Sequence, residues 1–428
     1  MKIAIAGYGI EGKANYAYWN APENKLKIVD EREIIEDLPE NTETILGENA
    51  FSQLQDFNLV VRSAGVAPYK IKTDGKIWSS TNEFFKQCPA PIIGITGTKG
   101  KGTTSSLIAE ILKASGKKVH LVGNIGVPAL TELSKISKED LVVYELSSFQ
   151  LWDLEKSPET AVVLMIEPDH LNVHKDLKDY IEAKSNITRY QKSTDTVFYN
   201  PENTYSLEIA NISPGNKLPY NSKQTAYIEN DSIFIDRTKV CSIEDVRIPG
   251  RHNLENICAA ISAAWIYSRD IGSINTAIKN FTGLPHRLKL VSQKKGVSYY
   301  DDSISTTIGS AIAALRSFES PKTILLGGSK KGVDFAELAK EIAISNIRKV
   351  VVYGDESPQI IKALESENYT NFTHLENTTM KEIVDYASSV SEAGDIVILS
   401  PACASFDMFS SYQDRGDQFV SAVQGLDG

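Results

Sequence analysis

The stretch Ile92-Ile-Gly-Ile-Thr-Gly-Thr-Lys-Gly-Lys-Gly-Thr-Thr104 decides the fold of this chain. Its first part, Ile92 to Thr96, is apolar and rich in β-branched residues, which predicts a buried strand. The glycine-rich segment Gly97 to Lys101 follows, and Thr103 to Leu112 has the pattern of a helix. Strand, glycine loop and helix in this order predict a phosphate loop, in which backbone N–H groups and the helix N-terminus hold an anion. Lys101 would reach the terminal phosphates of a nucleotide.

The composition is that of a globular protein with several domains. The chain has 428 residues, of which 42% are hydrophobic and 23% are charged. The net charge of −10 argues against a general nucleic-acid or anionic-membrane binder. The four cysteines are scattered without CxxC spacing, so we expect reduced thiols. The first apolar run stops at Gly7, too short for a signal-peptide core, and no apolar run could span a membrane. We therefore expect a cytoplasmic protein.

The N-terminal segment has the pattern of a nucleotide-binding unit. A predicted strand, Lys2 to Ala6, leads into Gly7-Tyr-Gly-Ile-Glu-Gly12 and a helix, and a second strand ends at Asp30. A GxGxxG motif followed about 20 residues later by an acid fits a dinucleotide fingerprint. The alternative is that these glycines only let the helix pack closely on the strand. The segment ends in Cys88-Pro-Ala-Pro91, which predicts a linker and a first domain at residues 1–90.

Polar residues follow the strands of the central segment. Asn124 comes after Val119 to Val122, Glu145 ends Leu141 to Glu145, and His170 comes after Ala161 to Ile166. Because the carboxyl ends of parallel strands meet at one edge, we expect these residues and the phosphate loop to share a crevice. Glu145 is a candidate Mg²⁺ ligand, or else a solvated acid at a strand end. We interpret the nearby His174 as an ordinary loop histidine.

Lys184 lies on the apolar stripe of the predicted helix from Leu177 to Tyr190, three or four residues after Ile181 and Tyr180. A buried ammonium is costly, and desolvation lowers its pKa. A neutral amine can react with CO₂ to form a carbamate, a carboxylate that could sit beside Mg²⁺. The alternative is that Lys184 extends its amine to water along the helix edge.

The remaining segments continue the alternation of strands and helices. Asn253 and Asn256, one turn apart, either cap the helix that they open or present amides to a nucleotide. From about residue 284, a second open α/β sheet is predicted. Its strands are Val297 to Tyr300, Lys322 to Leu326, Val350 to Tyr353 and Asp395 to Leu399. Its polar loops are Asp301 to Thr307, Gly327 to Gly332 and Ser400 to Ser405.

These motifs, in this order and over essentially the whole chain, resemble the Mur ligase family. The residues that carry the resemblance are Gly97 to Thr104, Gly123 to Gly126, Glu145 to Ser148, Asp169 and His170, Lys184, Gly250 to Asn253 with Asn256, His286 and Arg287, and Ser400 to Ser405. The central set also marks folylpolyglutamate synthases. The Ser-Pro-Ala-Cys-Ala-Ser stretch, the later Arg415-Gly416 and the short N-terminal domain are similar to the glutamate-adding branch.

The resemblance implies an α/β protein of three domains. A Rossmann-like N-terminal domain, residues 1–90, would bind a UDP-linked substrate. A central P-loop mononucleotide-binding sheet domain, residues 91–283, would bind ATP, and a Rossmann-like C-terminal domain, residues 284–428, the amino acid. The implied reaction is ATP-dependent and Mg²⁺-dependent addition of D-glutamate to UDP-N-acetylmuramoyl-L-alanine through an acyl phosphate, in peptidoglycan precursor synthesis. The residues themselves leave the glutamate enantiomer open. We expect a monomer that binds neither nucleic acid nor membrane.

The same resemblance implies roles for individual residues. ATP would be bound by Gly97, Thr98, Lys99, Gly100, Lys101, Gly102, Thr103, Asn253, Asn256, Arg287 and Asp302. The metal would be bound by Thr103, Glu145, His170 and Lys184, and the catalytic residues would be Lys101, His170 and Lys184. The UDP substrate would contact Gly9, Ile10, Asp30, Arg32 and Asn124. Glutamate would contact Thr306, Lys331, Ser405, Phe406 and Tyr412.

Two positions depart from the family pattern. Gly102 stands where a Ser or Thr is usual, so Thr103 would have to supply the hydroxyl for Mg²⁺, and Ile304 stands where a Lys is usual. Because of these departures, a nucleotide-binding protein without turnover stays an alternative interpretation. A second alternative is a folylpolyglutamate synthase-like ligase. An NAD-dependent oxidoreductase, based on Gly7 to Gly12, leaves the phosphate loop and Lys184 unexplained.

Overall fold

The structure is a computed structural model that describes residues 1–35, 37–124, 127–330 and 332–427. The chain divides into two compact units. Unit 1 comprises Met1–Val246 with Arg251–Phe281, and unit 2 comprises Arg247–Gly250 with Thr282–Gly428. Each unit is described by itself. None of the helices in the described ranges is long and apolar enough to cross a membrane.

The first sheet of unit 1 is parallel and has the strand order β3-β2-β1-β4-β5. Its strands are β1 (Lys2–Ala6), β2 (Lys25–Asp30), β3 (Glu43–Leu46), β4 (Leu59–Arg62) and β5 (Lys76–Ser79), and its helices are α1 (Ile10–Trp19) and α2 (Ser80–Gln87). Alternate apolar residues of β1, β2 and β4 are buried on the two faces in separate clusters. This order matches the first five strands of the Rossmann order 3-2-1-4-5-6.

The second sheet of unit 1 is also parallel, with the order β11-β10-β9-β6-β8-β7. Its strands are β6 (Ile92–Thr96), β7 (Val119–Gly123), β8 (Leu141–Glu145), β9 (Thr160–Val163), β10 (Thr196–Tyr199) and β11 (Asn216–Pro219). Its helices are α3 (Lys101–Ala114), α4 (Ala129–Glu132), α5 (Ser148–Leu151), α6 (Leu177–Arg189), α7 (Thr204–Ile212), α8 (Arg251–Trp265) and α9 (Ile271–Asn280). The strand with the phosphate-loop motif, β6, is central and buried along its whole length.

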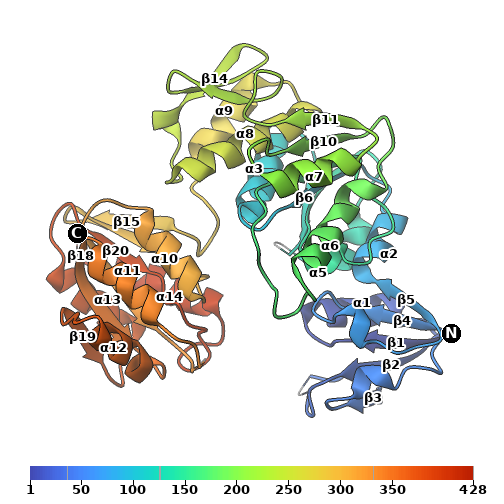
Figure 1. The fold of residues 1–428 in the computed structure, drawn as a ribbon, viewed down its shortest axis with the longest axis horizontal. Coiled ribbons are helices and arrows are strands. Elements are labelled where there is room, and N and C mark those ends of the chain that lie inside the picture. The colour runs from blue at the N-terminus through green and yellow to red at the C-terminus, as the bar shows by residue number, and fades with distance from the viewer. Residues whose placement is uncertain (36, 125–126, 331, 428) are drawn as a thin grey trace. The chain divides into compact units, whose positions relative to one another are not determined.

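Helices cover both faces of this second sheet, as the alternating pattern predicts. Helix α3 packs against α8 and α9, whereas α6 packs against α5 and α7 (Figure 1). On the face of the sheet that α6 and α7 cover, alternate strand residues such as Ile92 and Val142 pack with these helices in one hydrophobic cluster. The α6 and α3 faces thus meet the sheet at the same strand, β6, so both can contribute to whatever binds at its carboxyl end.

The part of unit 1 between β11 and α8 is a small antiparallel sheet of β12 (Tyr227–Glu229), β13 (Ser232–Ile235) and β14 (Thr238–Ser242). The sequence predicts a β-rich patch here. Positive φ values at Asn230 and Asp231, and at Asp236 and Arg237, close the two hairpin turns. The patch is therefore a three-stranded meander.

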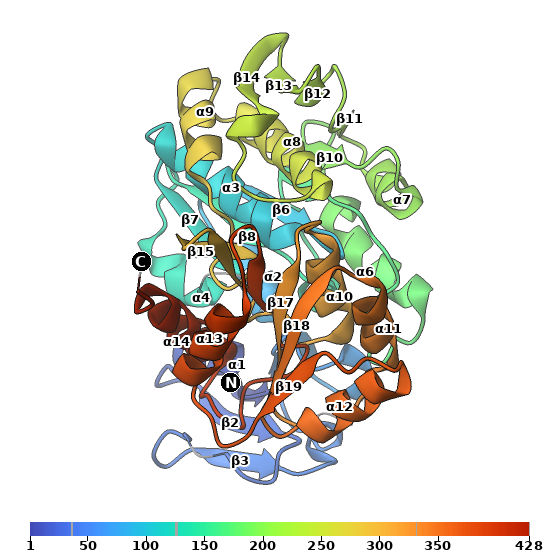
Figure 2. The same cartoon turned by 90° about the vertical axis from the view of Figure 1, so that its left-hand side faces the viewer.

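Unit 2 contains a third sheet with the order β15-β16-β20-β17-β18-β19. Its strands are β15 (Lys289–Lys294), β16 (Val297–Asp301), β17 (Lys322–Gly327), β18 (Ile347–Tyr353), β19 (Phe372–Leu375) and β20 (Ile396–Leu399). Its helices are α10 (Ile308–Arg316), α11 (Ala336–Ile344), α12 (Ser357–Ser366), α13 (Met380–Val390) and α14 (Tyr412–Gln424). Only β15 pairs antiparallel. Helices α10, α11 and α12 bury one face of the sheet, and the neighbouring α13 and α14 bury the other (Figure 2).

The α/β class predicted from the sequence is confirmed, with three largely parallel sheets. The division of residues 1–283 into two domains at residue 90 stays a prediction, since both sheets lie within one compact unit.

Candidate active site

The phosphate-loop motif folds as a loop between β6 and α3, and the helix begins at Lys101, two residues before the predicted start. Gly97 and Gly100 adopt φ values of +155° and +84°. A Cβ atom on Gly100 would lie 2.3 Å from Oδ1 of Asn256, so only glycine fits beside that amide. Lys101 Nζ donates to the carbonyl oxygens of Gly97 and Thr98, each at 3.1 Å. The loop thus has the backbone shape of an anion cradle.

Lys184 of α6 lies directly beneath this loop. Its side chain is only 1% exposed, and Nζ donates to the Gly97 carbonyl oxygen at 2.9 Å and to Thr96 Oγ1 at 3.4 Å. Burial, together with the nearby Lys101 ammonium, holds the pKa of Lys184 well below its ordinary value, although Asp169 and Glu145 oppose this. The alternative in which the amine reaches water along the helix edge is wrong.

Glu145, at the carboxyl end of β8, is only 2% exposed, and its two carboxylate oxygens differ in their hydrogen bonding. Oε1 accepts a hydrogen bond from Asn124 Nδ2 at 2.9 Å, which confirms that the two residues meet at this edge. Oε2 is buried and, within the described part of the chain, has no hydrogen-bond partner. A buried carboxylate oxygen without a partner is unfavourable unless a cation meets it. The reading of Glu145 as a solvated acid is therefore wrong.

This arrangement fits Mg²⁺ held jointly by protein and nucleotide. In the described ranges, no group of three or more His, Cys, Asp or Glu side chains is placed to hold a metal ion. Mg²⁺ is typically bound through one or two carboxylates together with phosphate oxygens and water, so a complete protein cage is not required. The unpaired Oε2 of Glu145 is the observation that makes the site suitable.

His170 and His174 lie on the loop between β9 and α6. His170 has φ = +54°, and its half-exposed ring packs 4.9 Å from the Phe149 ring. His174 is 2% exposed, whereas we predicted an ordinary loop histidine. Its Nδ1 lies 3.1 Å from Asp179 Oδ2 and its Nε2 lies 3.0 Å from Ser148 Oγ. The sequence pattern alone did not indicate that His174 is buried.

Asn253 and Asn256 lie inside the first turns of α8, so neither caps its start. Asn256 Nδ2 donates to Asn253 Oδ1 at 3.1 Å, and Asn256 borders Gly100. Helix α8 thereby brings an amide against the phosphate loop. Thr103 is buried in the first turn of α3, next to Gly102. Lys99 is exposed and pairs with Glu167 at 3.0 Å.

The N-terminal glycine motif has two different uses. A Cβ on Gly12 would lie 1.9 Å from the Gly7 carbonyl oxygen, so Gly12 serves close packing of α1 on β1. Gly9 has open space around it and precedes the exposed Ile10. Asp30 accepts from the Tyr8 N–H at 2.8 Å and from Arg32 at 2.9 Å. Burial alone would raise the pKa of Asp30, but these bonds lower it.

The N-terminal sheet is fastened to the second sheet by Arg62, which is fully buried. Arg62 donates to both carboxylate oxygens of Asp153, at 2.7 and 2.8 Å, and to the Phe149 carbonyl oxygen at 2.7 Å. Asn82 adds bonds to the same segment, donating to the Asp153 carbonyl oxygen and accepting from the Glu155 N–H. The sequence reasoning did not single out any of these residues.

In unit 2, Asp302 is 2% exposed and fully hydrogen-bonded within the protein. It accepts from the Leu288 N–H at 3.1 Å, from Ser400 Oγ at 2.8 Å and from Ser305 Oγ. Burial raises the pKa of Asp302 to about 6, and these three hydrogen bonds, followed by the charge of the exposed Arg287, partly oppose the shift. The predicted ATP contacts of Asp302 and Arg287 stay predictions.

Arg415 connects two polar loops of unit 2. It is fully buried and donates to Ser303 Oγ (2.9 Å), the Ser303 carbonyl oxygen (2.8 Å) and the carbonyl oxygens of Cys403 (3.0 Å) and Ala404 (3.3 Å). It therefore joins two of the loops singled out in the sequence, which contain the predicted glutamate contacts Thr306 and Ser405.

The other predicted glutamate contacts are spread around these loops. Ser303 Oγ donates to the Tyr412 carbonyl oxygen at 2.8 Å, so Tyr412 belongs to the Arg415 network. Phe406 is 75% exposed beside the buried Ser405. Lys331 lies outside the described residues. A Cβ on Gly416 would lie 2.1 Å from His286 Nδ1, which explains the Arg415-Gly416 pair.

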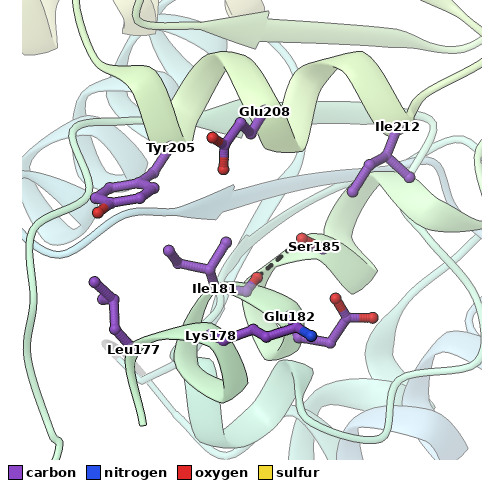
Figure 3. Close-up of a pocket in the computed structure, with 8 residues that line it drawn as sticks. All are labelled: Leu177, Lys178, Ile181, Glu182, Ser185, Tyr205, Glu208 and Ile212. Atoms are coloured by element: carbon purple, nitrogen blue, oxygen red, sulfur yellow. Dashed lines mark hydrogen bonds between the residues drawn. The ribbon is translucent and has the colours of Figure 1, made fainter.

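A groove of about 480 Å³ runs between α6 and α7, but it is separate from this site (Figure 3). It is lined by residues of both helices, including Ile181, Ser185 and Ile212, with Lys178, Glu182 and Glu208 among the polar ones. Lys184 is not part of its lining. The site at the phosphate loop is therefore on the sheet side of α6.

A phosphate loop on a central parallel strand, a buried lysine under it and a carboxylate oxygen beside it define an α/β nucleotide-dependent enzyme. Residues 95–264 match the family model described as Mur ligase middle domain, and residues 286–403 match that described as Mur ligase, glutamate ligase domain. The chain belongs to the Mur ligase family and is an ATP-dependent ligase.

Curated relatives support this assignment over most of the chain. The UDP-N-acetylmuramoylalanine--D-glutamate ligase of Clostridium tetani is 38% identical over 394 residues, covering 89% of this chain and 86% of the relative. The ligase of the same name from Clostridium kluyveri is 35% identical over 445 residues, covering 99% and 97%. The solved structure of UDP-N-acetylmuramate-alanine ligase from Thermotoga maritima has a TM-score of 0.61 at 18% identity and covers 99% of each chain, which shows a common fold.

Proposed function

We propose that this ligase adds D-glutamate to UDP-N-acetylmuramoyl-L-alanine, with cleavage of ATP to ADP and phosphate, in cytoplasmic peptidoglycan precursor synthesis. The observation that carries the proposal is the meeting of the phosphate loop, Glu145 and Lys184 at the carboxyl end of one sheet. The names of relatives that share 35% and 38% of their sequence with this chain support the choice of substrates.

The phosphate loop would hold ATP through its backbone N–H groups, and Lys101 would move from the loop carbonyls to the terminal phosphates. Phosphoryl transfer depends mainly on positioning and charge neutralisation, which these groups supply. The amide of Asn256 borders the loop and is bonded to that of Asn253, and the two amides would orient the nucleotide. In unit 2, Arg287 and Asp302 would complete the ATP contacts.

Mg²⁺ would be held by Glu145, His170, a carboxylate formed on Lys184 and the hydroxyl of Thr103. The ion would neutralise charge on the phosphate oxygens. Glu145 offers its unpaired Oε2, and burial lowers the pKa of Lys184, which shifts it toward the neutral amine that reacts with CO₂. Gly102 carries no hydroxyl, which leaves Thr103 as the nearest candidate in the first turn of α3.

The two other substrates would bind at the ends of the remaining sheets. Gly9, Ile10, Asp30 and Arg32 would hold the UDP group, with Asn124 on the substrate beside Glu145. Thr306, Lys331, Ser405, Phe406 and Tyr412 would hold glutamate. The substrate carboxylate attacks the γ-phosphorus of ATP to give an acyl phosphate, and the glutamate amine then attacks the acyl carbon and releases phosphate.

Phosphate release from ATP tests this proposal when only the amino acid is varied. With UDP-N-acetylmuramoyl-L-alanine present, we expect release with D-glutamate and none with L-glutamate or without an amino acid. Release with L-glutamate alone would reassign the enantiomer. Release that needs a folate in place of the UDP substrate would support a folylpolyglutamate synthase-like activity, and no release with any amino acid would contradict the proposal.

A further inference from the structure

A chain of three polar side chains, two of them buried, runs beside the proposed metal site. Asp179 at the start of α6, His174 on the preceding loop and Ser148 at the start of α5 are joined by contacts of 3.1 and 3.0 Å. The order carboxylate, imidazole, hydroxyl is that of a nucleophilic triad. Ser148 and His174 are each only 2% exposed, and the His174 ring lies between aromatic rings of α5 and α6. A substrate could not reach the Ser148 hydroxyl, so this chain serves another purpose.

The direction of each hydrogen bond follows from Asp179. Its carboxylate is approached by the Lys175 N–H at 3.1 Å, by Trp152 Nε1–H at 3.1 Å and by His174 Nδ1. An ionised carboxylate only accepts, so His174 Nδ1 carries the proton and donates. In the neutral imidazole, Nε2 is then the acceptor, and Ser148 Oγ–H donates to it. Both ring nitrogens of His174 are thereby satisfied, which fixes the ring in one orientation.

The fixed ring also holds the backbone of His170. The amides of Val173 and His174 both donate to the His170 carbonyl oxygen, at 3.0 and 2.9 Å. The rings of His170 and His174 pack on the same Phe149 ring, at 4.9 and 5.3 Å between centroids. His170 has φ = +54°, a conformation that is unfavourable for an L residue and persists only where the surroundings impose it.

The loop is held at further points. Tyr69 Oη, in the connection between β4 and β5, donates to the Val173 carbonyl oxygen at 2.8 Å. Thr98 of the phosphate loop bonds the backbone of Glu167 at 2.9 and 3.0 Å. The phosphate loop therefore fixes the start of the segment 167–176, and His174 fixes its end.

We propose that His174 is a positioning residue, which, held by Asp179 and Ser148, keeps the loop 167–176 closed and sets the place of His170 in the site. The use of His170 as a metal ligand rests on the proposed function, whereas the closure of the loop does not.

Hydrogen–deuterium exchange of the full chain tests the closure. The variant His174→Phe keeps a ring between the aromatic side chains but loses both hydrogen bonds. We expect the Val173 and His174-position amides to exchange about 30- to 150-fold faster, since each of the two lost bonds contributes about 1–1.5 kcal/mol. The control is His374→Phe, at a partly exposed histidine of β19 in unit 2, which should leave these amides unchanged. A folded His174→Phe with unchanged exchange would overturn the proposal.

A second variant keeps the test open if His174→Phe does not fold. Ser148→Ala removes one hydroxyl and leaves the Nε2 acceptor without its donor, so the same amides should exchange faster, by a smaller factor. Unchanged exchange in a folded Ser148→Ala would then overturn the proposal.

Binding of Mn²⁺ with ADP, read by electron paramagnetic resonance, separates this inference from the proposed function. We expect about tenfold weaker Mn²⁺ binding in His170→Ala and in His174→Phe. Unchanged Mn²⁺ affinity in His170→Ala would contradict the metal role of His170, while the exchange data would still decide the role of His174.

Discussion

Replacement of Arg415 by lysine should destabilise unit 2, because a lysine cannot make all the hydrogen bonds of the Arg415 guanidinium. The guanidinium distributes four hydrogen bonds among three nitrogens, toward Ser303, Cys403 and Ala404, and is fully buried. A lysine ammonium is a single centre and cannot reach acceptors on both loops. At least two of its four hydrogen bonds would be lost, at about 1–2 kcal/mol each. We therefore expect a loss of about 2–4 kcal/mol in the free energy of unfolding of unit 2.

Native-state hydrogen exchange measures this loss where it arises. A loss of about 2–4 kcal/mol corresponds to roughly 30- to 1000-fold faster exchange of the slowest amides in β16 and β20. Tryptophan fluorescence provides an internal reference, since Trp19, Trp78, Trp152 and Trp265 all belong to unit 1.

The matched control is the same substitution at Arg316, which is 67% exposed and pairs with Glu341. Lysine preserves that ion pair, so Arg316→Lys should cost less than about 1 kcal/mol. If Arg415→Lys costs no more than Arg316→Lys, the loop-joining role of Arg415 is refuted.

Three further predictions follow from the site. Lys184→Ala should lose activity and regain part of it with an added short-chain carboxylic acid; normal activity without the acid would contradict a carboxylate role. Gly100→Ala, with φ = +84° and a Cβ 2.3 Å from Asn256 Oδ1, should weaken ATP binding at least about tenfold in calorimetry. The control Gly116→Ala has φ = +76° with open space around it, so it should lose stability but keep ATP affinity. Burial raises the pKa of Asp302 to about 6, above about 3.9 for an unfolded aspartate, so its protonation stabilises the fold fully below about pH 4, and this stabilisation is lost as the pH rises through 6. The stability of the wild type relative to Asp302→Asn, from urea unfolding, should therefore fall by up to about 2–3 kcal/mol between pH 4 and 7; an increase would contradict this sign.

The sequence predicts best where one local rule acts alone. The strand Ile92–Thr96 and the buried stripe of α6 follow from periodicity and are confirmed. The predicted strand Ala161 to Ile166 instead ends at Val163. Ile166 exchanges two hydrogen bonds with the side chain of Asn203, which replaces the sheet as its partner. That side chain is distant in sequence, so periodicity could not reveal it.

The two edge strands of the unit 2 sheet escaped prediction for a different reason. Strand β15 has the polar sequence Lys-Leu-Val-Ser-Gln-Lys, and β19 has only four residues. Edge strands are commonly short and polar, because such features prevent unwanted pairing. The features that protect an edge strand also remove its hydrophobic signal.

In the candidate site too, some features follow from local sequence patterns and others depend on tertiary contacts. The convergence of Asn124 and Glu145 follows from the topology of a parallel sheet, and Lys184 follows from helix periodicity. The burial of His174 by Trp152 and Phe149, and the Arg62–Asp153 pair, depend on tertiary contacts between distant segments. No pattern in a single sequence specifies those contacts.

The transfer of one oxygen atom tests most directly whether the substrate carboxylate is activated by attack on the γ-phosphate of ATP. UDP-N-acetylmuramoyl-L-alanine is labelled with ¹⁸O in both oxygens of its terminal carboxylate and incubated with the enzyme, ATP, Mg²⁺ and D-glutamate. If a carboxylate oxygen attacks the γ-phosphorus and the amine then breaks the carbon–oxygen bond, the released phosphate carries one ¹⁸O and the new amide keeps the other. Phosphate without ¹⁸O would mean that water cleaves ATP, and it would contradict activation of the carboxylate at this site.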